Sequence, residues 1–427
     1  MTRTQCMMFS LMLATAGAGC GAAPPEADEA ALVQSAVTNI VISGRVTNSS
    51  GTALSNVTVT LAGSASKSQQ TTTTGAYSFG GLTSGSYSVR PTRTNCGFTP
   101  DVVNVNNLNA STTRNFVGSG SGCAAAPAVT PITRKYMSLI YNPIIESQGG
   151  ARLITLQGWN NPDTLATQFV ADVATGSNNL ATYVAGPRVE LDAYPVKEDG
   201  FQYTDATFMA CLADVANCHK PGQEMGFGYA IDYLAMLNSQ NICARFNAGE
   251  FDELWMFGAP FMGFWEANQA GTQAINTNGP IVVGSTCQGR LNIFGFAYHV
   301  GVGNMLHDYG HRIEGTMYSL LPNGGSLFEQ FTRSDLLNPG QAQCGRTHFT
   351  PTSGFEYDYN NTRSVTSSCA DWLNYPNRTG ATTTISCSAW GCEERGYQIW
   401  WMQHLPHVAG VAADGSSNNW WTYILAR

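Results

Sequence analysis

Residues 43–61, SGRVTNSSGTALSNVTVTL, decide the fold of the first part of the chain. Within this stretch Val57, Val59 and Leu61 alternate with polar residues, and Asn, Ser and Gly gather ahead of them. Alternation with a period of two is the pattern of a strand that buries one face, and clusters of small polar residues mark turns. The stretch therefore predicts short β-strands separated by turns.

The same pattern continues after this stretch. Tyr77 and Phe79 flank a polar residue, Tyr87 and Val89 do the same, and turn residues separate the runs. Several short strands at close spacing are typical of a small antiparallel sandwich. We therefore expect a β-sandwich domain over residues 39–118.

The segments SGRVTNSSGTALSNVTVTL (43–61), TTTTGAYSFGGLTSGSYSV (71–89) and GFTP (97–100) resemble the carboxypeptidase regulatory-like domains. These domains have a transthyretin-like fold. The resemblance implies an accessory, non-catalytic module, and despite the family's name it implies nothing about peptidase activity. Cys96 departs from the family pattern, and it could bridge to Cys123 and pin the linker that follows.

Residues 1–20 have the features of an export signal. Arg3 supplies a basic start, and an apolar run from Met7 to Ala18 is too short to remain as a membrane-spanning helix. The ending AGAGC resembles a bacterial lipobox, with Cys20 as the lipidated residue, although Gly17 stands where Leu is usual. Ordinary cleavage near Ala23 is the alternative. We therefore expect an exported protein, either secreted or anchored to a membrane through a lipid on Cys20.

Composition divides the rest of the chain. Residues 21–38 are rich in Ala and Pro and predict a tether, and residues 119–130, rich in Gly, Ser and Ala, predict a linker. Residues 131–427 then alternate strand-like runs, such as KYMSLIYNP (135–143), with helical ones, such as PDTLATQFVADVAT (162–175). Such alternation predicts an α/β domain with a mixed or mostly parallel sheet.

Beyond Leu320 the sequence predicts a loop-rich cap with four cysteines and many aromatic residues. The whole chain is thus expected to be multidomain. A small all-β sandwich of the transthyretin or immunoglobulin type is followed by an α/β domain with a disulfide-stapled, loop-rich C-terminal cap.

Twelve cysteines are present, and ten remain once Cys6 and Cys20 are assigned to the N-terminal signal. An even number in an exported protein favours disulfides over metal-bound thiolates. Connectivity cannot be deduced from sequence, but pairing in chain order is the simplest arrangement. The ten candidates are Cys96, Cys123, Cys211, Cys218, Cys243, Cys287, Cys344, Cys369, Cys387 and Cys392.

The stretch MLHDYGHRIEG, residues 305–315, carries the candidate chemistry. Apolar residues around it recur near helical spacing, and His307 and His311 lie four residues apart. On a helix this spacing places both imidazoles on one face, about 6 Å apart along the axis, so that one metal ion can bind both. The motif resembles the HExxH motif of zincin metallopeptidases in its two histidines and its helical setting.

The motif departs from the zincins at Asp308, which stands where they have the catalytic Glu. By this resemblance His307 and His311 would bind zinc, and Asp308 would activate water. Glu314 is expected to be the third ligand or an orienting partner. The alternative is a buried helix whose polar residues are satisfied by neighbours such as Arg312. Other candidate ligands are Glu329, Asp335, His348, Glu356 and Asp358.

Three further stretches could form binding surfaces. Trp265, Glu266 and His299 are expected in loops after strands, where they would line a substrate cleft. The run THFTPTSGFEYDYNNT (347–362) could ligate a metal or bind a sugar, although a packed surface loop is the simpler interpretation. The terminal pairs at 400–401 and 420–421 place four Trp residues near the C-terminus, for stacking on sugars or for closing a core.

The overall charge excludes one class of partner. A net charge of −8 argues against nucleic-acid binding, which needs a basic face. The sequence therefore predicts an exported cell-surface zinc-dependent hydrolase, a metallopeptidase by its resemblance to zincins, with protein or peptide as substrate. The alternative is a non-catalytic surface protein that binds glycan or protein through its Trp-rich C-terminal domain.

Overall fold

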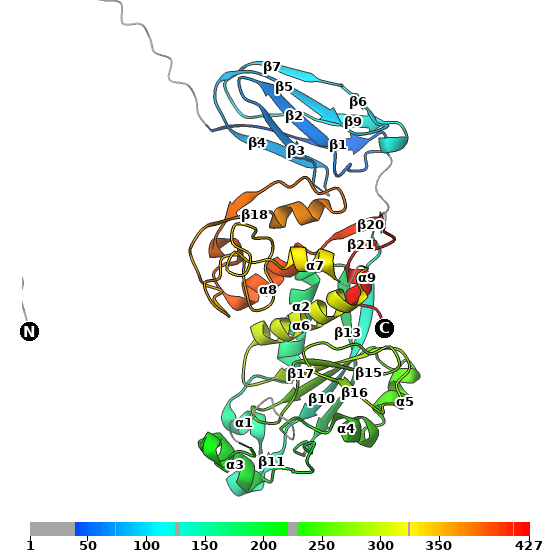
Figure 1. Cartoon of the computed structure of the whole chain (residues 1–427), viewed down its shortest axis with the longest axis vertical. Coiled ribbons are helices and arrows are strands. Elements are labelled where there is room, and N and C mark those ends of the chain that lie inside the picture. The colour runs from blue at the N-terminus through cyan, green and yellow to red at the C-terminus, as the bar shows by residue number, and fades with distance from the viewer. Residues whose placement is uncertain (1–38, 73, 124–128, 221–228, 323–324, 413) are drawn as a thin grey trace, which may run out of the picture. The chain divides into compact units, whose positions relative to one another are not determined.

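The computed structural model describes residues 39–427 except 73, 124–128, 221–228, 323–324 and 413. The chain forms two compact units, residues 1–123 and 124–427 (Figure 1). The expected signal with Cys20 and the expected tether lie outside the described residues. Among the described helices, none combines the length and the apolar character that a membrane crossing requires.

The first unit is a β-sandwich, as its alternating sequence predicts. Its elements are β1 (Ile40–Asn48), β2 (Thr58–Gly63), β3 (Lys67–Gln70), β4 (Ala76–Leu82), β5 (Gly85–Thr92), β6 (Gly97–Thr99), β7 (Val103–Leu108), β8 (Thr112–Thr113), β9 (Phe116–Ser119) and the 3₁₀ helix η1 (Ser121–Cys123). One sheet has the order β4–β1–β9–β6, with β8 paired to β1, and the other has the order β3–β2–β5–β7.

The core of the sandwich consists of the alternating apolar residues. Val57, Val59 and Leu61 are fully buried, and Tyr77 and Phe79 from the other sheet are each 3% exposed. Because side chains alternate between the two faces of a strand, these residues meet between the sheets while their polar neighbours face outward. The predicted sandwich is therefore confirmed, and its core is separate from that of the second unit.

The second unit is a mixed α/β domain. Its strands are β10 (Ile132–Tyr141), β11 (Ile144–Ile145), β12 (Ala151–Arg152), β13 (Ala181–Leu191), β14 (Glu253–Gly258), β15 (Ala267–Ala270), β16 (Ile281–Val282), β17 (Leu291–Ala297), β18 (Val365–Ser367), β19 (Thr383–Ile385), β20 (His407–Val411) and β21 (Ser417–Asn419). The main sheet has the order β13–β10–β14–β17–β15–β16. Strands β13, β10, β14 and β17 are parallel, and β15 runs antiparallel to β17.

Helices separate and cover these strands (Figure 1). The α-helices are α1 (Leu153–Gln157), α2 (Pro162–Gly176), α3 (Asp205–Ala213), α4 (Tyr233–Ser239), α5 (Ile242–Asn247), α6 (Val302–Leu320), α7 (Ser326–Phe331), α8 (Glu394–Gln403) and α9 (Trp421–Ile424). The 3₁₀ helices are η2 (Glu146–Gln148), η3 (Val215–Asn217), η4 (Cys369–Asn374) and η5 (Cys387–Trp390). Pro162 begins α2 behind the capping side chain of Asn161, as its position in the sequence predicts.

One strand of the main sheet has an unusual sequence. Trp265 and Glu266, expected in a loop, directly precede β15, whose Asn268 and Gln269 are 1% exposed. The amide of Gln269 donates to Asn292 Oδ1 inside the sheet, so this buried strand lacks the apolar pattern that predicts strands. Helix α4 begins at Tyr233, and the side chain of Asp232 caps it by accepting from the N–H of Ala235.

The Trp-rich C-terminus closes a core. Trp401, Trp420 and Trp421 are fully buried, and Trp400 is half-buried. Phe328 and Phe331 of α7 pack against this cluster. Of the two expected roles, stacking on sugars or closing a core, the burial of three of the four rings favours the core. Trp400 and Trp401 lie on α8, and the other pair lies at the start of α9.

A buried ion pair anchors α6 to the sheet. Arg312 Nη1 lies 2.6 Å from Glu253 Oε1 of β14 and donates to the hydroxyl of Tyr183 of β13. Both charged side chains are 1% exposed. Sequence reasoning offered Arg312 as a partner for the histidines. Its side chain faces the sheet instead, and its contacts fix the position of α6 on the sheet.

Five disulfides cross-link the described chain in sequential order, the pairing that sequence reasoning favours. They are Cys96–Cys123, Cys211–Cys218, Cys243–Cys287, Cys344–Cys369 and Cys387–Cys392. Disulfides in this number are typical of extracellular proteins. Four of them lie in the second unit, and two of these staple the cap beyond α7.

Candidate metal centre

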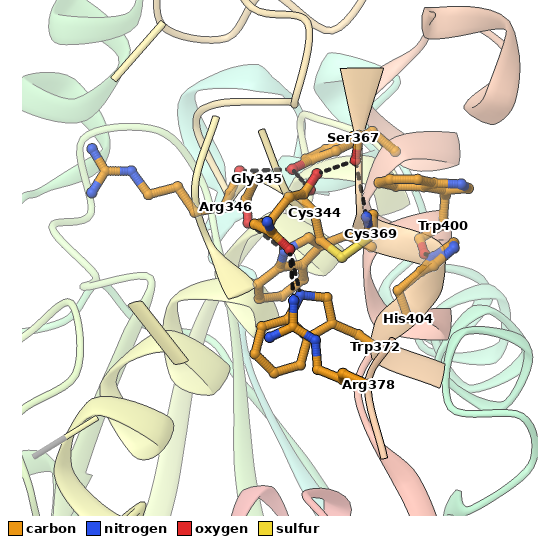
Figure 2. The surroundings of a disulfide bond; sticks show 12 residues. Cys344, Gly345, Arg346, Ser367, Cys369, Trp372, Arg378, Trp400 and His404 are labelled. Carbon is orange, nitrogen blue, oxygen red and sulfur yellow. Dashed lines mark hydrogen bonds between the residues drawn. A yellow bond between two sulfur atoms is a disulfide. The ribbon is translucent and has the colours of Figure 1, made fainter. Parts of the chain in front are cut away.

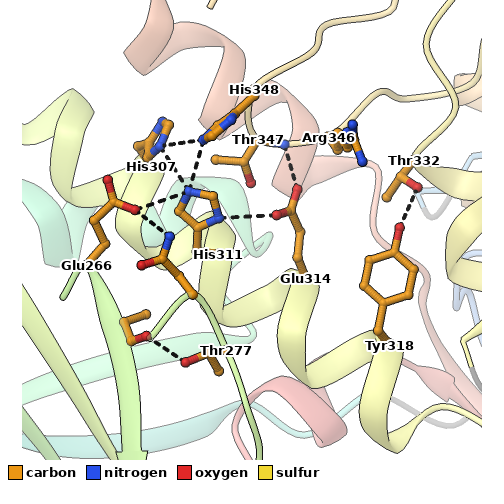
Figure 3. A network of polar contacts seen from close by, with 12 residues as sticks. Glu266, Thr277, His307, His311, Glu314, Tyr318, Thr332, Arg346, Thr347 and His348 are labelled. Carbon is orange, nitrogen blue, oxygen red and sulfur yellow. Dashed lines mark hydrogen bonds and ion pairs between the residues drawn. The ribbon is translucent and has the colours of Figure 1, made fainter. Parts of the chain in front are cut away.

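Three histidine rings converge in the second unit. The Nε2 atoms of His307 and His311 are 3.1 Å apart, and His348 Nε2 lies 3.2 Å from the first and 3.1 Å from the second (Figure 3). The three side chains are 4%, 11% and 24% exposed, respectively. The three nitrogens therefore form a nearly equilateral triangle in a largely water-excluded place.

The spacing of this triangle suits a single metal ion. In a tetrahedral centre with metal–nitrogen bonds of about 2.0–2.1 Å, the ligand nitrogens are about 3.3–3.4 Å apart, close to the separations found here. The group His307, His311 and His348 could therefore hold a metal ion.

Each ring has a carboxylate behind it. Nδ1 of His307 lies 3.1 Å from Glu394 Oε1, Nδ1 of His311 lies 3.3 Å from Glu314 Oε2, and Nδ1 of His348 lies 3.3 Å from Glu356 Oε1. An ionised carboxylate only accepts hydrogen bonds, so each Nδ1 is the donor and each Nε2 presents a lone pair. Three lone pairs directed at one point repel one another unless a cation lies between them, and such carboxylate–histidine pairs are typical behind metal ligands.

Helix α6 supplies two of the three rings by local geometry alone. Its apolar residues Met305, Leu306, Tyr309 and Ile313 are fully buried and fix the rotation of the helix on the sheet. With this rotation the two histidines, four residues apart, share one face of the helix. Their Nε2 atoms are therefore brought to within 3.1 Å of each other.

The third ring, His348, comes from the loop after α7 and is fixed by several contacts. The disulfide Cys344–Cys369 ties the start of this loop to η4 (Figure 2). From α8, the hydroxyl of Tyr397 contacts the carbonyl oxygens of Cys344 and Arg346 at 3.1 Å, and Trp401 Nε1 donates to the carbonyl of Gly345 at 2.8 Å. The loop is thereby held rigidly enough to place a ligand.

The residues around this disulfide are also held by specific contacts (Figure 2). Trp372 Nε1 donates to Gln343 Oε1 at 2.9 Å, and the guanidinium of Arg378 lies 3.7 Å from the centre of the Trp372 ring. Ser367 Oγ donates to the carbonyl of Gln343 at 2.8 Å. The chain on both sides of the cross-link is therefore packed and hydrogen-bonded.

Glu314 orients His311 rather than joining the triangle. Its Oε2 lies beside Nδ1 of His311, on the ring edge away from the other histidines, and its Oε1 accepts from the backbone N–H of Thr347. Burial raises the pKa of Glu314, but the hydrogen bonds from His311 and Thr347 outweigh it and lower the pKa below the ordinary value. Of the two roles expected for Glu314, the structure therefore favours the orienting one, and His348 takes the third place among the rings.

The pKa values of His311 and His348 are shifted in opposite directions. Burial lowers the pKa of His311, but the hydrogen bond and charge of Glu314 and the charge of Glu266 raise it above its ordinary value. The pKa of His348 is lowered by burial and by the neighbouring His307 and His311. In the absence of a metal, a proton on the triangle therefore favours His311 over His348.

Asp308, the expected water-activating residue, is buried next to His307. It is 1% exposed, and neither carboxylate oxygen has a hydrogen-bond partner. Burial, together with the charges of Glu266 and Glu394, raises its pKa well above the ordinary value. An Asp is one methylene shorter than the zincin Glu, which is consistent with its position below the surface of the site.

Glu266 lies beside the triangle, on the Nε2 edge of His311. Its Oε2 is 3.3 Å from His311 Nε2 and accepts from Asn278 Nδ2 at 2.8 Å, and its side chain is 34% exposed (Figure 3). Two acceptors at this separation need a proton or a cation near both. Sequence reasoning placed Glu266 in a substrate cleft, and the structure brings its carboxylate beside the ring of His311.

Two tyrosines of the His348 loop also reach the rings. The hydroxyl of Tyr357 lies 3.3 Å from His348 Nε2. The hydroxyl of Tyr359 lies 3.4 Å from His307 Nδ1 and donates to the carbonyl of Thr347 at 2.9 Å. The run 347–362, interpreted most simply as a surface loop, therefore supplies a ring, a carboxylate and two hydroxyls to the centre.

The other expected site residues lie elsewhere. His299 is exposed and packs near Trp159, with ring centroids 6.0 Å apart. Trp265 is half-buried, and its ring is close to Gly279. Asp335 pairs with Arg363 at 2.9 Å, and Asp358 accepts from Asn361 at 2.7 Å. None of these residues belongs to the group of three histidines.

Sequence reasoning missed Glu394. This residue begins α8, far along the chain from His307, and no spacing connects the two. A carboxylate at a helix N-terminus is electrostatically favourable, but many surface helices share that feature. Only the packing of α8 against α6 shows its role.

Comparisons with solved structures find only distant likenesses. A streptococcal ancillary pilin is 13% identical, with a TM-score of 0.18 over 23% of this chain and 36% of the pilin chain. The TIE protein of Bacillus anthracis is 12% identical, with a TM-score of 0.18 over 27% of this chain and 20% of its own. The pilus 2b backbone protein of group B streptococcus is 14% identical, with a TM-score of 0.16 over 19% and 42%. The matched parts span less than half of each of these three proteins.

Family comparison gives a firmer result for one part of the chain. No curated protein matches the sequence. Residues 41–131 match the family model of the carboxypeptidase regulatory-like domain, which agrees with the resemblance seen in the sequence. This match covers the β-sandwich, and the three histidines lie outside it.

Proposed function

We propose that the second unit is an exported zinc-dependent hydrolase acting on protein or peptide, with the sandwich as its accessory module. The observation that carries this proposal is the triangle of three Nε2 atoms, each backed by a carboxylate on Nδ1. Zinc held by three protein nitrogens keeps a position open and acts there as a Lewis acid on water or a carbonyl group.

A hydrolase also needs a base near that open position. Glu266 satisfies this requirement best, because its side chain is partly exposed and Asn278 holds one oxygen within 3.3 Å of His311 Nε2. Asp308, which the motif nominates, lies buried without a hydrogen bond. We infer that Glu266 accepts the proton of the attacking water, and that Asp308 supports the helix beneath the ligands.

The first test is metal content. The purified chain with intact disulfides is expected to retain about one zinc per molecule by elemental analysis, and His311→Ala is expected to lose it. Cleavage of a mixed peptide library is expected to stop with a chelator and to return with added zinc. Failure of the folded, oxidised chain to bind stoichiometric zinc would overturn the proposal.

The second test separates the two carboxylates. Glu266→Gln is expected to retain zinc and to lose cleavage by about 100-fold or more, the usual contribution of a general base. Asp308→Asn, its matched control on α6, is expected to retain most of the activity. The reverse order would assign the base to Asp308, as the motif implies.

The alternative function is a non-catalytic surface protein. Glycan stacking at the Trp-rich terminus has less support, because Trp401, Trp420 and Trp421 are fully buried and cannot offer a ring face. A glycan or protein that binds equally well to the wild type and to a His307→Ala/His311→Ala variant would favour this alternative.

A further inference from the structure

Gly310 lies on the face of α6 that carries the ligand rings. It follows His307 by three residues and precedes Glu314 by four, so it is a neighbour of both on the helix surface. The residue is buried, and its backbone is helical, a conformation that alanine adopts readily. Gly is among the least favourable residues inside a helix, because it loses the most backbone freedom on folding. The presence of Gly here therefore needs a reason other than backbone conformation.

The reason is the close approach of Thr347, the residue before His348. A Cβ atom at position 310 would lie 2.6 Å from Thr347 Oγ1 and 3.1 Å from Thr347 Cγ2, and real Cβ atoms essentially never show contacts below 3.0 Å. Rotation of the Thr347 side chain could vacate only one of these two positions, because two of the three substituents on its Cβ are heavy atoms. An added methyl group would therefore push Thr347 away from the helix.

Thr347 cannot retreat without loss of hydrogen bonds. Its N–H donates to Glu314 Oε1 of α6 at 2.8 Å, and its carbonyl accepts from Tyr359 at 2.9 Å and from Gln398 Nε2 of α8 at 3.2 Å (Figure 3). The side chain of Thr347 is fully buried. Displacement of Thr347 would therefore move the peptide that leads directly to His348.

We propose that Gly310 is a positioning residue, which sets the distance of His348 from the two rings of α6 and so completes the triangle. An ordinary contact of 3.4 Å or more at position 310 would require Thr347 to shift by several tenths of an ångström. Ligands must be held to within about 0.5 Å of their working geometry, so a shift of this size matters. This inference rests on the metal centre of the proposed function and adds a determinant that the spacing of the histidines does not supply.

Two other glycines of α6 offer matched comparisons. At Gly303 the nearest neighbour of an added Cβ would be Arg395 Cβ at 3.5 Å, which is an ordinary contact. At Gly315 an added Cβ would meet Thr277 Cα at 2.7 Å, which is nearly as close as the contact at Gly310, but that segment supplies no ring. Gly303 therefore controls for the change of residue, and Gly315 controls for crowding of the helix.

Zinc titration of the full-length, oxidised chain against a competing chelator tests the proposal. Gly310→Ala is expected to bind zinc about 10–100-fold more weakly, the range that follows loss of an outer support of a ligand. Gly303→Ala is expected to keep the affinity of the wild type. Gly315→Ala is expected to unfold at a lower temperature but to keep most of its zinc affinity, because the crowding acts on a segment without a ring.

A compensating change gives a readout that a general loss of stability would not produce. Thr347→Ala removes the two atoms that would crowd position 310 and keeps the backbone hydrogen bonds of that residue. Gly310→Ala/Thr347→Ala is therefore expected to regain most of the lost zinc affinity, with Thr347→Ala alone as the reference. If Gly310→Ala does not fold, recovery of folding and zinc binding in the double variant supports the contact, and no recovery overturns it.

Three outcomes would overturn the role of Gly310 and leave the proposed function standing. They are unchanged zinc affinity in Gly310→Ala, an equal loss of affinity in Gly315→Ala, and no recovery in the double variant. Failure of the wild type to bind zinc would overturn both proposals.

Discussion

The two sources of the ligand rings, α6 and the loop that carries His348, reach one point by different physical routes. On α6 the ring positions follow from helical periodicity, and a buried ion pair fixes the helix on the sheet. On the loop no periodicity operates, and a disulfide with three hydrogen bonds from α8 holds the backbone in place. The comparison teaches that two of the three rings of a candidate metal centre can be placed by local structure, while the third depends on tertiary cross-links.

The sharpest way to break the comparison is to remove the ring that only the loop supplies. His348→Ala is expected to reduce zinc affinity well beyond the ~10–100-fold that follows loss of a carboxylate behind a ligand. His404→Ala is the control, because that histidine bonds the carbonyl of Trp400 and lies in the aromatic cluster. Zinc titration against a competing chelator measures both. Equal affinity in His348→Ala and the wild type would remove the loop from the centre.

Loss of the ion pair between Arg312 and Glu253, which anchors α6, is expected to have the next largest effect. Arg312→Met leaves Glu253 buried without its cation, which typically costs about 3–5 kcal/mol of folding free energy. Urea unfolding measures this loss. The double variant Arg312→Met/Glu253→Gln is expected to recover part of it, because no buried charge is then left alone. No recovery would mean that the pair acts through packing instead of charge.

Removing the disulfide Cys344–Cys369 tests whether this cross-link holds the loop that carries His348. The Cys344→Ser/Cys369→Ser variant opens a cross-link of 25 residues and is expected to cost about 3 kcal/mol and to weaken zinc binding. Cys211→Ser/Cys218→Ser, across a separation of 7 residues and in another part of the domain, is the control and is expected to leave zinc affinity unchanged. Calorimetry and zinc titration give the two readings. Similar zinc affinity in both variants would show that α8 alone holds the loop.

The smallest expected effect is a difference in proton affinity between the rings. In the metal-free chain, NMR titration is expected to find His311 with a pKa above 6.5 and His348 with one below it. The raised pKa of His311 adds stability that is present below pH 6.5 and lost as pH rises through the folded value. The lowered pKa of His348 costs stability at low pH, and that cost disappears as pH rises towards 6.5.

A variant sharpens this last prediction. Glu314→Gln removes the charge that raises the pKa of His311, and it is expected to bring the two titrations closer together. Glu356→Gln, which acts on His348, is expected to widen the difference, because that hydrogen bond raises the pKa of His348. Opposite movements would mean that burial, and not the carboxylates, controls the protons of the triangle.

The sequence by itself determined the features that depend on local pattern. The alternation at Val57, Val59 and Leu61 specified strands with one buried face, because side chains alternate across a strand. The spacing of His307 and His311 specified two rings on one helical face, because a helix turns once in about 3.6 residues. The count of cysteines in an exported chain favoured disulfides, and their order along the chain suggested the pairing.

Tertiary structure alone decided the remainder. His348 joins the triangle because a disulfide and α8 hold its loop, and Glu394 supports His307 because α8 packs on α6. The same packing placed Glu314 beside Nδ1 of His311 and brought Glu266 and Tyr357 to the Nε2 edges of His311 and His348. These contacts join residues far apart in the chain, and no local periodicity encodes them, because they exist only once the core has closed and excluded water.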